Sequence, residues 1–160
     1  MPQATVQFDA SQREHRIAPA IHGHLLEPVG RGIEGGLHES VEDGPTEGLT
    51  FRPRVIEALA ALHIPVLKWP GGYFAGQYRW RDGIGPVDQR PKRRNFFHGG
   101  IETNAFGTEE FLSLCRELGA QPWLCLNSAS GTVREAGDWV EYCNGPAGTA
   151  VADLRVAAGR

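Results

Sequence analysis

Lys68-Trp69-Pro70-Gly71-Gly72-Tyr73-Phe74 marks the sharpest change of character in this sequence, from a strand to a loop. It directly follows the apolar run Ile64-Pro65-Val66-Leu67, which predicts a short buried strand that ends at Trp69. Proline has no backbone N–H to donate and glycine permits turns that other residues resist, so this strand must end abruptly. We expect a long loop to follow, up to about Asn104, and loops of that length inside compact domains are usually functional.

The predicted loop is rich in aromatic residues, arginine and glycine, as in Tyr78-Arg79-Trp80-Arg81-Asp82-Gly83. Aromatic rings stack on the apolar faces of sugar rings, and charged side chains form strong hydrogen bonds with hydroxyl groups. Residues of these types, gathered above the carboxyl end of a strand, therefore predict a carbohydrate-binding site.

Length and charge exclude several classes of protein. The chain of 160 residues is long enough for one domain with a core. Its net charge of -3 does not favour binding to nucleic acid or to an anionic membrane. The sequence has no N-terminal apolar signal region and no apolar run long enough to span a bilayer. We therefore expect a cytoplasmic protein that binds neither nucleic acid nor membranes.

The cysteines and histidines do not have the spacing of metal ligands. Cys115, Cys125 and Cys143 are an odd number of cysteines on predicted helices and a strand, and we expect buried, reduced thiols. His22 and His24 alternate along a predicted strand, so their side chains face opposite sides. The sequence predicts no metal site and no cofactor.

Strands and helices alternate along the chain. The predicted strands lie at residues 4–8, near the end of 17–27, at 64–69 and at 122–126, and the predicted helices start near Pro53, Thr108, Thr132 and Thr149. This order indicates parallel strands joined by right-handed crossovers, and both a doubly wound sheet and a (β/α)8 barrel fit it. The glycine pattern that binds phosphate in dinucleotide folds does not follow the first strand, which favours a barrel.

A series of motifs extends over nearly the whole chain. In order, these are Gly23-His24-Leu25-Leu26-Glu27, Trp69-Pro70-Gly71-Gly72, Trp80-Arg81-Asp82-Gly83-Ile84-Gly85-Pro86, Arg90-Pro91, Glu102-Thr103-Asn104-Ala105-Phe106-Gly107-Thr108 and Trp139-Val140-Glu141-Tyr142-Cys143-Asn144. In this order and spacing the motifs resemble the alpha-L-arabinofuranosidases of glycoside hydrolase family fifty-one.

The resemblance implies a retaining hydrolase that releases terminal alpha-L-arabinofuranose from arabinan and hemicellulose. It implies a (β/α)8 TIM-type barrel with a second β-sandwich domain, usually assembled as an oligomer. In this α/β chain, residues 1–16 would supply one strand of the sandwich, and residues 17–160 would form the N-terminal part of the barrel, with about three of its eight βα units.

The resemblance also implies a substrate site. Glu27 would match a carboxylate that hydrogen-bonds sugar hydroxyls in the pocket for the terminal sugar. Lys68 stands where the family usually has arginine, Tyr73 where it has a smaller residue, and His98 where it often has tryptophan. Together with Trp69, these residues are the predicted substrate-binding set.

The family's two catalytic glutamates have no counterpart in this chain, which ends at Arg160 before the strand that would carry the first of them. Retaining hydrolysis needs two carboxyl groups about 5–5.5 Å apart, so we predict no catalytic residue and binding of an arabinofuranosyl oligosaccharide without turnover. We also expect the chain to self-associate or to pair with a complementary barrel portion. Two alternatives stay open: a non-catalytic half-barrel scaffold or self-assembling module, and another retaining barrel glycosidase such as an endoglucanase.

Overall fold

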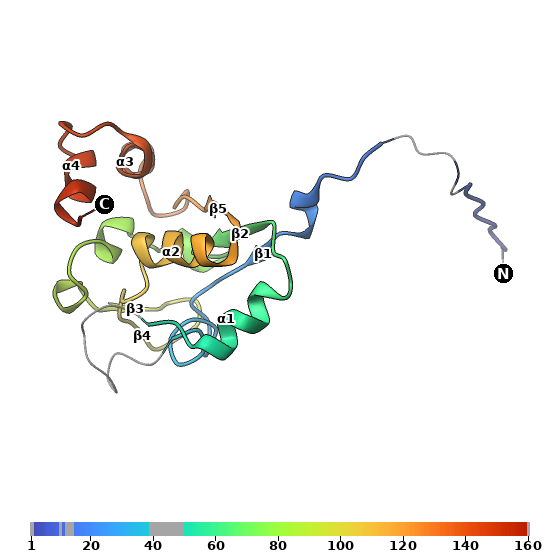
Figure 1. Ribbon diagram of the computed structural model, residues 1–160, viewed down its shortest axis with the longest axis horizontal. Coiled ribbons are helices and arrows are strands. Elements are labelled where there is room, and N and C mark those ends of the chain that lie inside the picture. The colour runs from blue at the N-terminus through green and yellow to red at the C-terminus, as the bar shows by residue number, and fades with distance from the viewer. Residues whose placement is uncertain (1, 10, 12–14, 39–49, 160) are drawn as a thin grey trace.

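The fold is built on a parallel sheet of three strands in the order β1-β2-β5 (Figure 1). The computed structural model describes residues 2–9, 11, 15–38 and 50–159. The strands are His24–Leu25 (β1), Val66–Trp69 (β2) and Gln121–Leu124 (β5). Both pairings are parallel, with Lys68 opposite Leu25 on one side and opposite Trp123 on the other. The predicted parallel α/β architecture is therefore confirmed.

Helices connect the strands, as the sequence predicts. The α-helices are α1 (Pro53–Ala60), α2 (Thr108–Leu118), α3 (Val133–Asn144) and α4 (Ala152–Ala157). None of the helices in the described ranges is long and apolar enough to cross a membrane.

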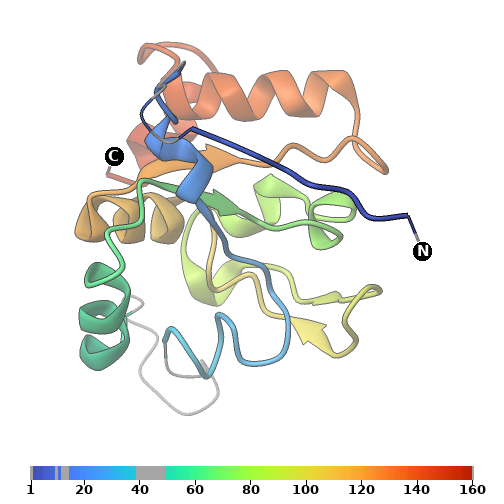
Figure 2. The ribbon, with the colours of Figure 1, turned by 90° about the vertical axis from the view of Figure 1, so that its right-hand side faces the viewer.

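The long loop after β2 contains more regular structure than the sequence predicts. It holds the 3-10 helices η2 (Phe74–Gly76), η3 (Trp80–Gly83) and η4 (Val87–Gln89), while η1 (Pro19–His22) precedes β1. The loop also forms an antiparallel hairpin of β3 (Arg93–Arg94) and β4 (Ile101–Glu102). In Figure 2 the hairpin, drawn in yellow, lies toward the right-hand ends of the strands, whereas α1 and α2 lie on the left.

A cluster of aromatic rings forms the core between the sheet, the helices and the loop. The fully buried Trp69 ring stacks on Phe111 of α2 with centroids 5.3 Å apart, and meets Trp139 of α3 edge-on at 6.1 Å. Tyr78 and Phe106 of the loop contact the same ring at 5.0 and 5.7 Å. Because two helices and the loop pack on one side chain, Trp69 ties the loop to the end of β2.

A buried ion pair holds the middle of the loop on α2. The Arg90 side chain is 3% exposed, and it donates two hydrogen bonds of 3.0 Å to the carboxylate of Glu110. The same guanidinium donates to the carbonyl oxygens of Gly85, Asn104 and Ala105. A guanidinium can satisfy this many acceptors because its donors form a planar fork.

The other face of the sheet is open. Successive strand residues point to opposite faces, so Lys68 faces away from Trp69 and the helices packed on it. Its neighbours across the sheet, Leu25 and Trp123, are 52% and 58% exposed. The apolar segment 17–27 also predicts that the strand near its end is buried, and this prediction is wrong. Within the described ranges β1 has a strand neighbour on one side, and both its residues are exposed.

The N-terminal segment extends away from the sheet (Figure 1). Residues 4–8, predicted to be an edge strand, pair with no strand in the described ranges, and Val6 and Phe8 are 88% and 85% exposed. Without a neighbouring strand the backbone has no ladder partner, so residues 4–8 do not form the predicted strand in this structure. The division into residues 1–16 and 17–160 stays a prediction.

Candidate functional site

Glu27 lies just beyond the carboxyl end of β1, where the Trp69-Pro70-Gly71-Gly72 segment leaves β2. Its side chain is 13% exposed. Its Oε1 atom accepts a hydrogen bond from the backbone N–H of Phe74 at 2.7 Å and lies 3.1 Å from Nε2 of His98. Two separate parts of the long loop therefore hold one carboxylate at the strand ends, where functional residues of parallel α/β folds gather.

A glycine allows the loop backbone to approach this carboxylate. Gly71 has φ of +120°, and a Cβ atom there would lie 2.4 Å from Cγ of Glu27. At Gly72 an added Cβ would meet Oε2 of Glu27 at 3.4 Å, an ordinary contact. The first glycine of the motif is thus required by its backbone conformation and by the close approach of Glu27.

The environment of Glu27 favours the charged form. Partial burial by itself raises the pKa of Glu27, but hydrogen bonds from Phe74 N–H, His98 and the Gly72 backbone, with the charge of His98, outweigh it. The net pKa lies below the ordinary value of 4.5. The carboxylate is therefore ionised at neutral pH and acts as an acceptor for hydroxyl donors.

A tight turn presents His98 to Glu27, and Asn95 forms its centre. Asn95 is 5% exposed, and its Oδ1 accepts hydrogen bonds from the backbone N–H groups of Phe97 at 3.2 Å and His98 at 2.9 Å. Its Nδ2 donates to the carbonyl of Pro28, the residue after Glu27, at 3.2 Å. Asn95 thus hydrogen-bonds to the backbone next to Glu27 and to the backbone of His98, and it links the two residues. The sequence patterns did not predict this role, although asparagine is typical of such turns.

The other predicted site residues lie in different surroundings. Trp69 is completely buried in the aromatic core, so no part of its ring is available to a sugar. Its role is to pack beneath the loop that carries the site. Lys68 is half-buried on the open face of the sheet. Tyr73 is 76% exposed and stacks on Phe97 with ring centroids 6.1 Å apart.

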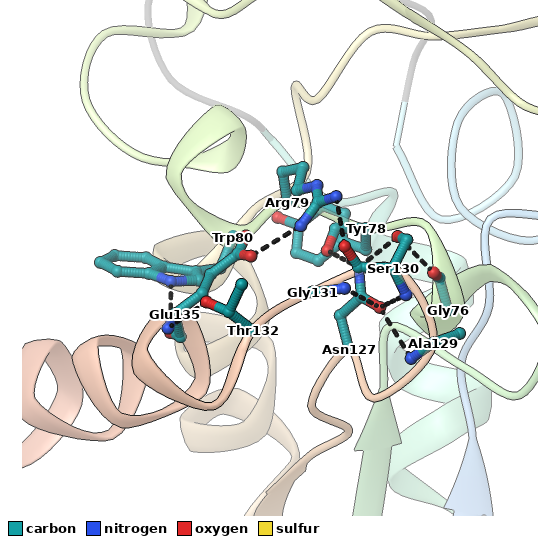
Figure 3. A network of polar contacts seen from close by, with 10 residues as sticks. All are labelled: Gly76, Tyr78, Arg79, Trp80, Asn127, Ala129, Ser130, Gly131, Thr132 and Glu135. Carbon is teal, nitrogen blue, oxygen red and sulfur yellow. Dashed lines mark hydrogen bonds and ion pairs between the residues drawn. The ribbon is translucent and has the colours of Figure 1, made fainter.

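Asn127, three residues after the end of β5, joins this segment to the long loop (Figure 3). Its Oδ1 accepts hydrogen bonds from the backbone N–H groups of Ala129, Ser130 and Gly131, and its Nδ2 donates to the carbonyl of Tyr78. Ser130 Oγ donates to the carbonyl of Gly76 at 2.7 Å. Both side chains are engaged with loop backbone, which gives them a structural role.

Arg79 extends this network to α3 (Figure 3). Its guanidinium lies 2.6 Å from the Glu135 carboxylate and donates to the carbonyl of Ser130 at 2.7 Å. Thr132 Oγ1 accepts a hydrogen bond from the Glu135 N–H at 3.1 Å, so Thr132 caps α3. Two loops from different strand ends are therefore fixed to one another beside the site.

A small cavity of about 90 Å³ adjoins His98. Glu34, Glu102 and Thr103 line it, and Thr103 Oγ1 donates to Glu34 at 3.2 Å. Burial raises the pKa of Glu102, the Asn104 N–H lowers it, and the charge of Glu34 raises it, with a net increase. The described residues contain no cluster of three or more histidine, cysteine, aspartate or glutamate side chains that could hold a metal ion.

The three cysteines are free, as predicted, and Cys115 is buried. The prediction of burial is wrong for Cys125 and Cys143, which are partly exposed. Burial raises the pKa of the Cys115 and Cys143 thiols to about 11. Since the thiolate is the nucleophilic form of cysteine, these two thiols are unreactive at neutral pH.

Comparison with known proteins identifies the family. The family model described as "Alpha-L-arabinofuranosidase 1 domain" matches residues 58–160, which is more than half of the chain. The chain belongs to the alpha-L-arabinofuranosidases of family fifty-one. The resemblance drawn from the motifs is therefore confirmed.

Curated relatives in this family include fungal and bacterial proteins. A probable alpha-L-arabinofuranosidase C from Aspergillus fumigatus is 45% identical over 98% of this chain and 31% of its own length. An intracellular exo-alpha-L-arabinofuranosidase from Bacteroides ovatus is 44% identical over the same shares of the two chains. The chain thus spans about a third of the length of the arabinofuranosidases it matches.

Solved arabinofuranosidase structures match the fold over the same part. The enzyme from Thermotoga maritima, solved in complex with arabinose, is 46% identical with a TM-score of 0.80, over 87% of this chain and 29% of that one. The family fifty-one enzyme from Xanthomonas axonopodis is 36% identical with a TM-score of 0.84, over 94% of this chain and 31% of that one. The α/β architecture with its parallel sheet is therefore shared with partial regions of these enzymes.

Proposed function

We propose that this chain forms the arabinofuranose-binding part of an alpha-L-arabinofuranosidase, with Glu27 as the main acceptor for sugar hydroxyls. The observation that carries the proposal is the ionised Glu27 carboxylate at the end of a parallel strand, held by Phe74 N–H and His98. Such a fixed charged acceptor forms hydrogen bonds with hydroxyl groups that are stronger than neutral ones. The arabinose complex of the Thermotoga maritima enzyme supports the choice of sugar.

The proposed ligand is a terminal alpha-L-arabinofuranoside of the kind found in arabinan and hemicellulose, and we propose that the chain alone binds it without turnover. A second carboxylate 5–5.5 Å away, as retaining hydrolysis needs, would raise the pKa of Glu27 by charge repulsion. The charge of His98 lowers this pKa instead.

The proposal extends to architecture and location. Residues 17–160 would form part of a (β/α)8 barrel, and residues 1–16 would supply a strand to a β-sandwich. The outer edges of β1 and β5, which have no strand neighbour in the described ranges, support pairing with further barrel strands or with a second copy. The intracellular relative from Bacteroides ovatus supports a cytoplasmic location.

Isothermal titration with methyl alpha-L-arabinofuranoside tests the proposal. We expect saturable binding that weakens about tenfold or more in Glu27→Ala, because a hydrogen bond to a charged group contributes about 1.5–3 kcal/mol. Glu117→Ala, at an exposed position of α2, is the matched control and should bind like the wild type. Equal affinity in all three proteins would place the sugar elsewhere.

A non-catalytic scaffold is the second candidate, because the open face of the sheet is apolar around Lys68. A scaffold predicts no saturable arabinoside binding by any variant, together with stable self-association. The titration and a sedimentation experiment on the same samples therefore separate the two functions.

A further inference from the structure

Two exposed aromatic side chains stack on each other next to the Glu27 site. Tyr73 is 76% exposed and Phe97 is 51% exposed, and their ring planes are inclined by 30° with centroids 6.1 Å apart. They come from opposite ends of the long loop, so the pair is a tertiary contact. Exposed apolar groups gathered in one place on a soluble protein often mark a binding site.

Both rings are tied to the carboxylate through their chain neighbours. Tyr73 precedes Phe74, whose N–H donates to Glu27, and Phe97 precedes His98, whose ring lies 3.1 Å from the same Oε1 atom. Consecutive Cα atoms are about 3.8 Å apart, so the aromatic pair begins within one residue of each contact. The pair is therefore continuous with the proposed sugar pocket.

The backbone and the packing fix the orientation of the pair. Asn95 Oδ1 accepts the Phe97 N–H, and the Phe97 ring lies against Gly76 of η2, where an added Cβ would meet two ring carbons at 3.9 Å. A platform held in this way loses little conformational freedom when a ligand binds, which favours affinity.

We propose that Tyr73 and Phe97 form a stacking site for the sugar that is linked to the terminal arabinofuranose. This inference rests on the proposed function, and it predicts that these two residues make the chain bind an oligosaccharide more tightly than a monosaccharide. Aromatic faces carry partial negative charge and attract the C–H groups on the apolar face of a sugar. Two rings offer far less than the roughly 800 Å² per partner of a stable protein interface, so the occupant is a small ligand.

Comparison of a monosaccharide ligand with a trisaccharide ligand tests the inference. The probes are methyl alpha-L-arabinofuranoside and alpha-1,5-linked arabinotriose, titrated into the 160-residue protein. Phe97→Ala and Tyr73→Ala should each lower arabinotriose affinity about five- to tenfold and change the affinity for the methyl glycoside by less than about twofold. Phe97→Tyr, which keeps an aromatic face, should retain most of the arabinotriose affinity.

Phe96→Ala is the matched control. Phe96 is 75% exposed in the same turn, but its ring lies under the guanidinium of Arg94 rather than in the stacked pair. This variant should bind both probes like the wild type, and circular dichroism should show equal folding of all variants.

The outcomes separate the inference from the proposed function. Wild-type binding of the methyl glycoside, with arabinotriose affinity unchanged by Phe97→Ala and Tyr73→Ala, would overturn the stacking site and leave the proposed function intact. Unchanged sugar affinity with loss of self-association in the two variants would assign the pair to contact between copies, and would also overturn it. No wild-type binding of either probe would overturn the proposed function and this inference together.

Discussion

Gly71 and Glu27 are so close that a single added atom on Gly71 would overlap the glutamate side chain. A Cβ at Gly71 would lie 2.4 Å from Cγ and 2.6 Å from Cβ of Glu27. The glycine belongs to the segment that ends β2, whereas the glutamate follows β1. This contact joins the segments that follow β1 and β2, and it places the Glu27 carboxylate against the backbone of the long loop.

Gly71→Ala should therefore destabilise the protein and weaken sugar binding. Alanine at φ of +120° is strained, and such backbone strain costs about 1–3 kcal/mol before the overlap with Glu27 is added. Gly72→Ala is the control, because its Cβ would make an ordinary contact. Urea unfolding measures the free energy of both variants, and equal values would contradict the proposed requirement for glycine at position 71.

Breaking the buried pair between Arg90 and Glu110 should be costly. Arg90→Ala leaves a 14% exposed carboxylate without its partner, and loss of one member of a buried pair costs about 3–5 kcal/mol. Arg93→Ala removes an ion pair with Asp82 whose arginine side chain is 59% exposed, so this variant should lose much less stability than Arg90→Ala. A thermal melt in which both variants lose the same stability would show that the loop does not depend on Arg90.

The contribution of Glu27 to stability should disappear in acid. Its pKa is lower in the folded protein than its ordinary value of 4.5, so the stabilisation is fully present above 4.5 and is lost as the pH falls through the folded-state pKa. The difference in unfolding free energy between wild type and Glu27→Gln should thus be largest near neutral pH and should shrink progressively as the pH falls below 4.5. A difference that grows on acidification would mean that the pKa is raised instead.

The chain should self-associate through the open face of its sheet. Two strand edges without a neighbour in the described ranges and the exposed Trp123 favour association of copies. Analytical ultracentrifugation should detect oligomers, and Trp123→Glu should shift them toward monomer. Val133→Glu, at a 92% exposed position of α3, is the control and should leave the distribution unchanged. A monodisperse wild-type monomer would refute this expectation.

Local patterns were sufficient to predict most elements of the sheet and its helices. The apolar run before Lys68 formed β2, and the spacing of apolar residues after Pro53 predicted α1. Both patterns involve residues that are close together in the sequence, and periodicity and backbone preference depend on such neighbours. The strand predicted at residues 4–8 is absent because a strand also needs a neighbouring strand to pair with. The composition of a segment does not show whether such a neighbour exists.

The site was predicted only in part, for the same physical reason. The position of Glu27 at a strand end was visible in the sequence, and its motif identified the family. The sequence could not show that Trp69 is buried, because burial depends on Phe111 and Trp139, which lie far along the chain.

Short-range spacing and motif order were enough to predict the parallel α/β class, the acidic residue Glu27 after β1 and the family membership. The surroundings of that acid depend on tertiary packing: the Phe74 N–H, the His98 ring and the Asn95 side chain that positions His98. The contacts of Glu27 with Phe74 and His98 join residues that are 47 and 71 positions apart, and local sequence preferences cannot predict such contacts. They form because packing of the aromatic core around Trp69 brings the loop back over the ends of the strands.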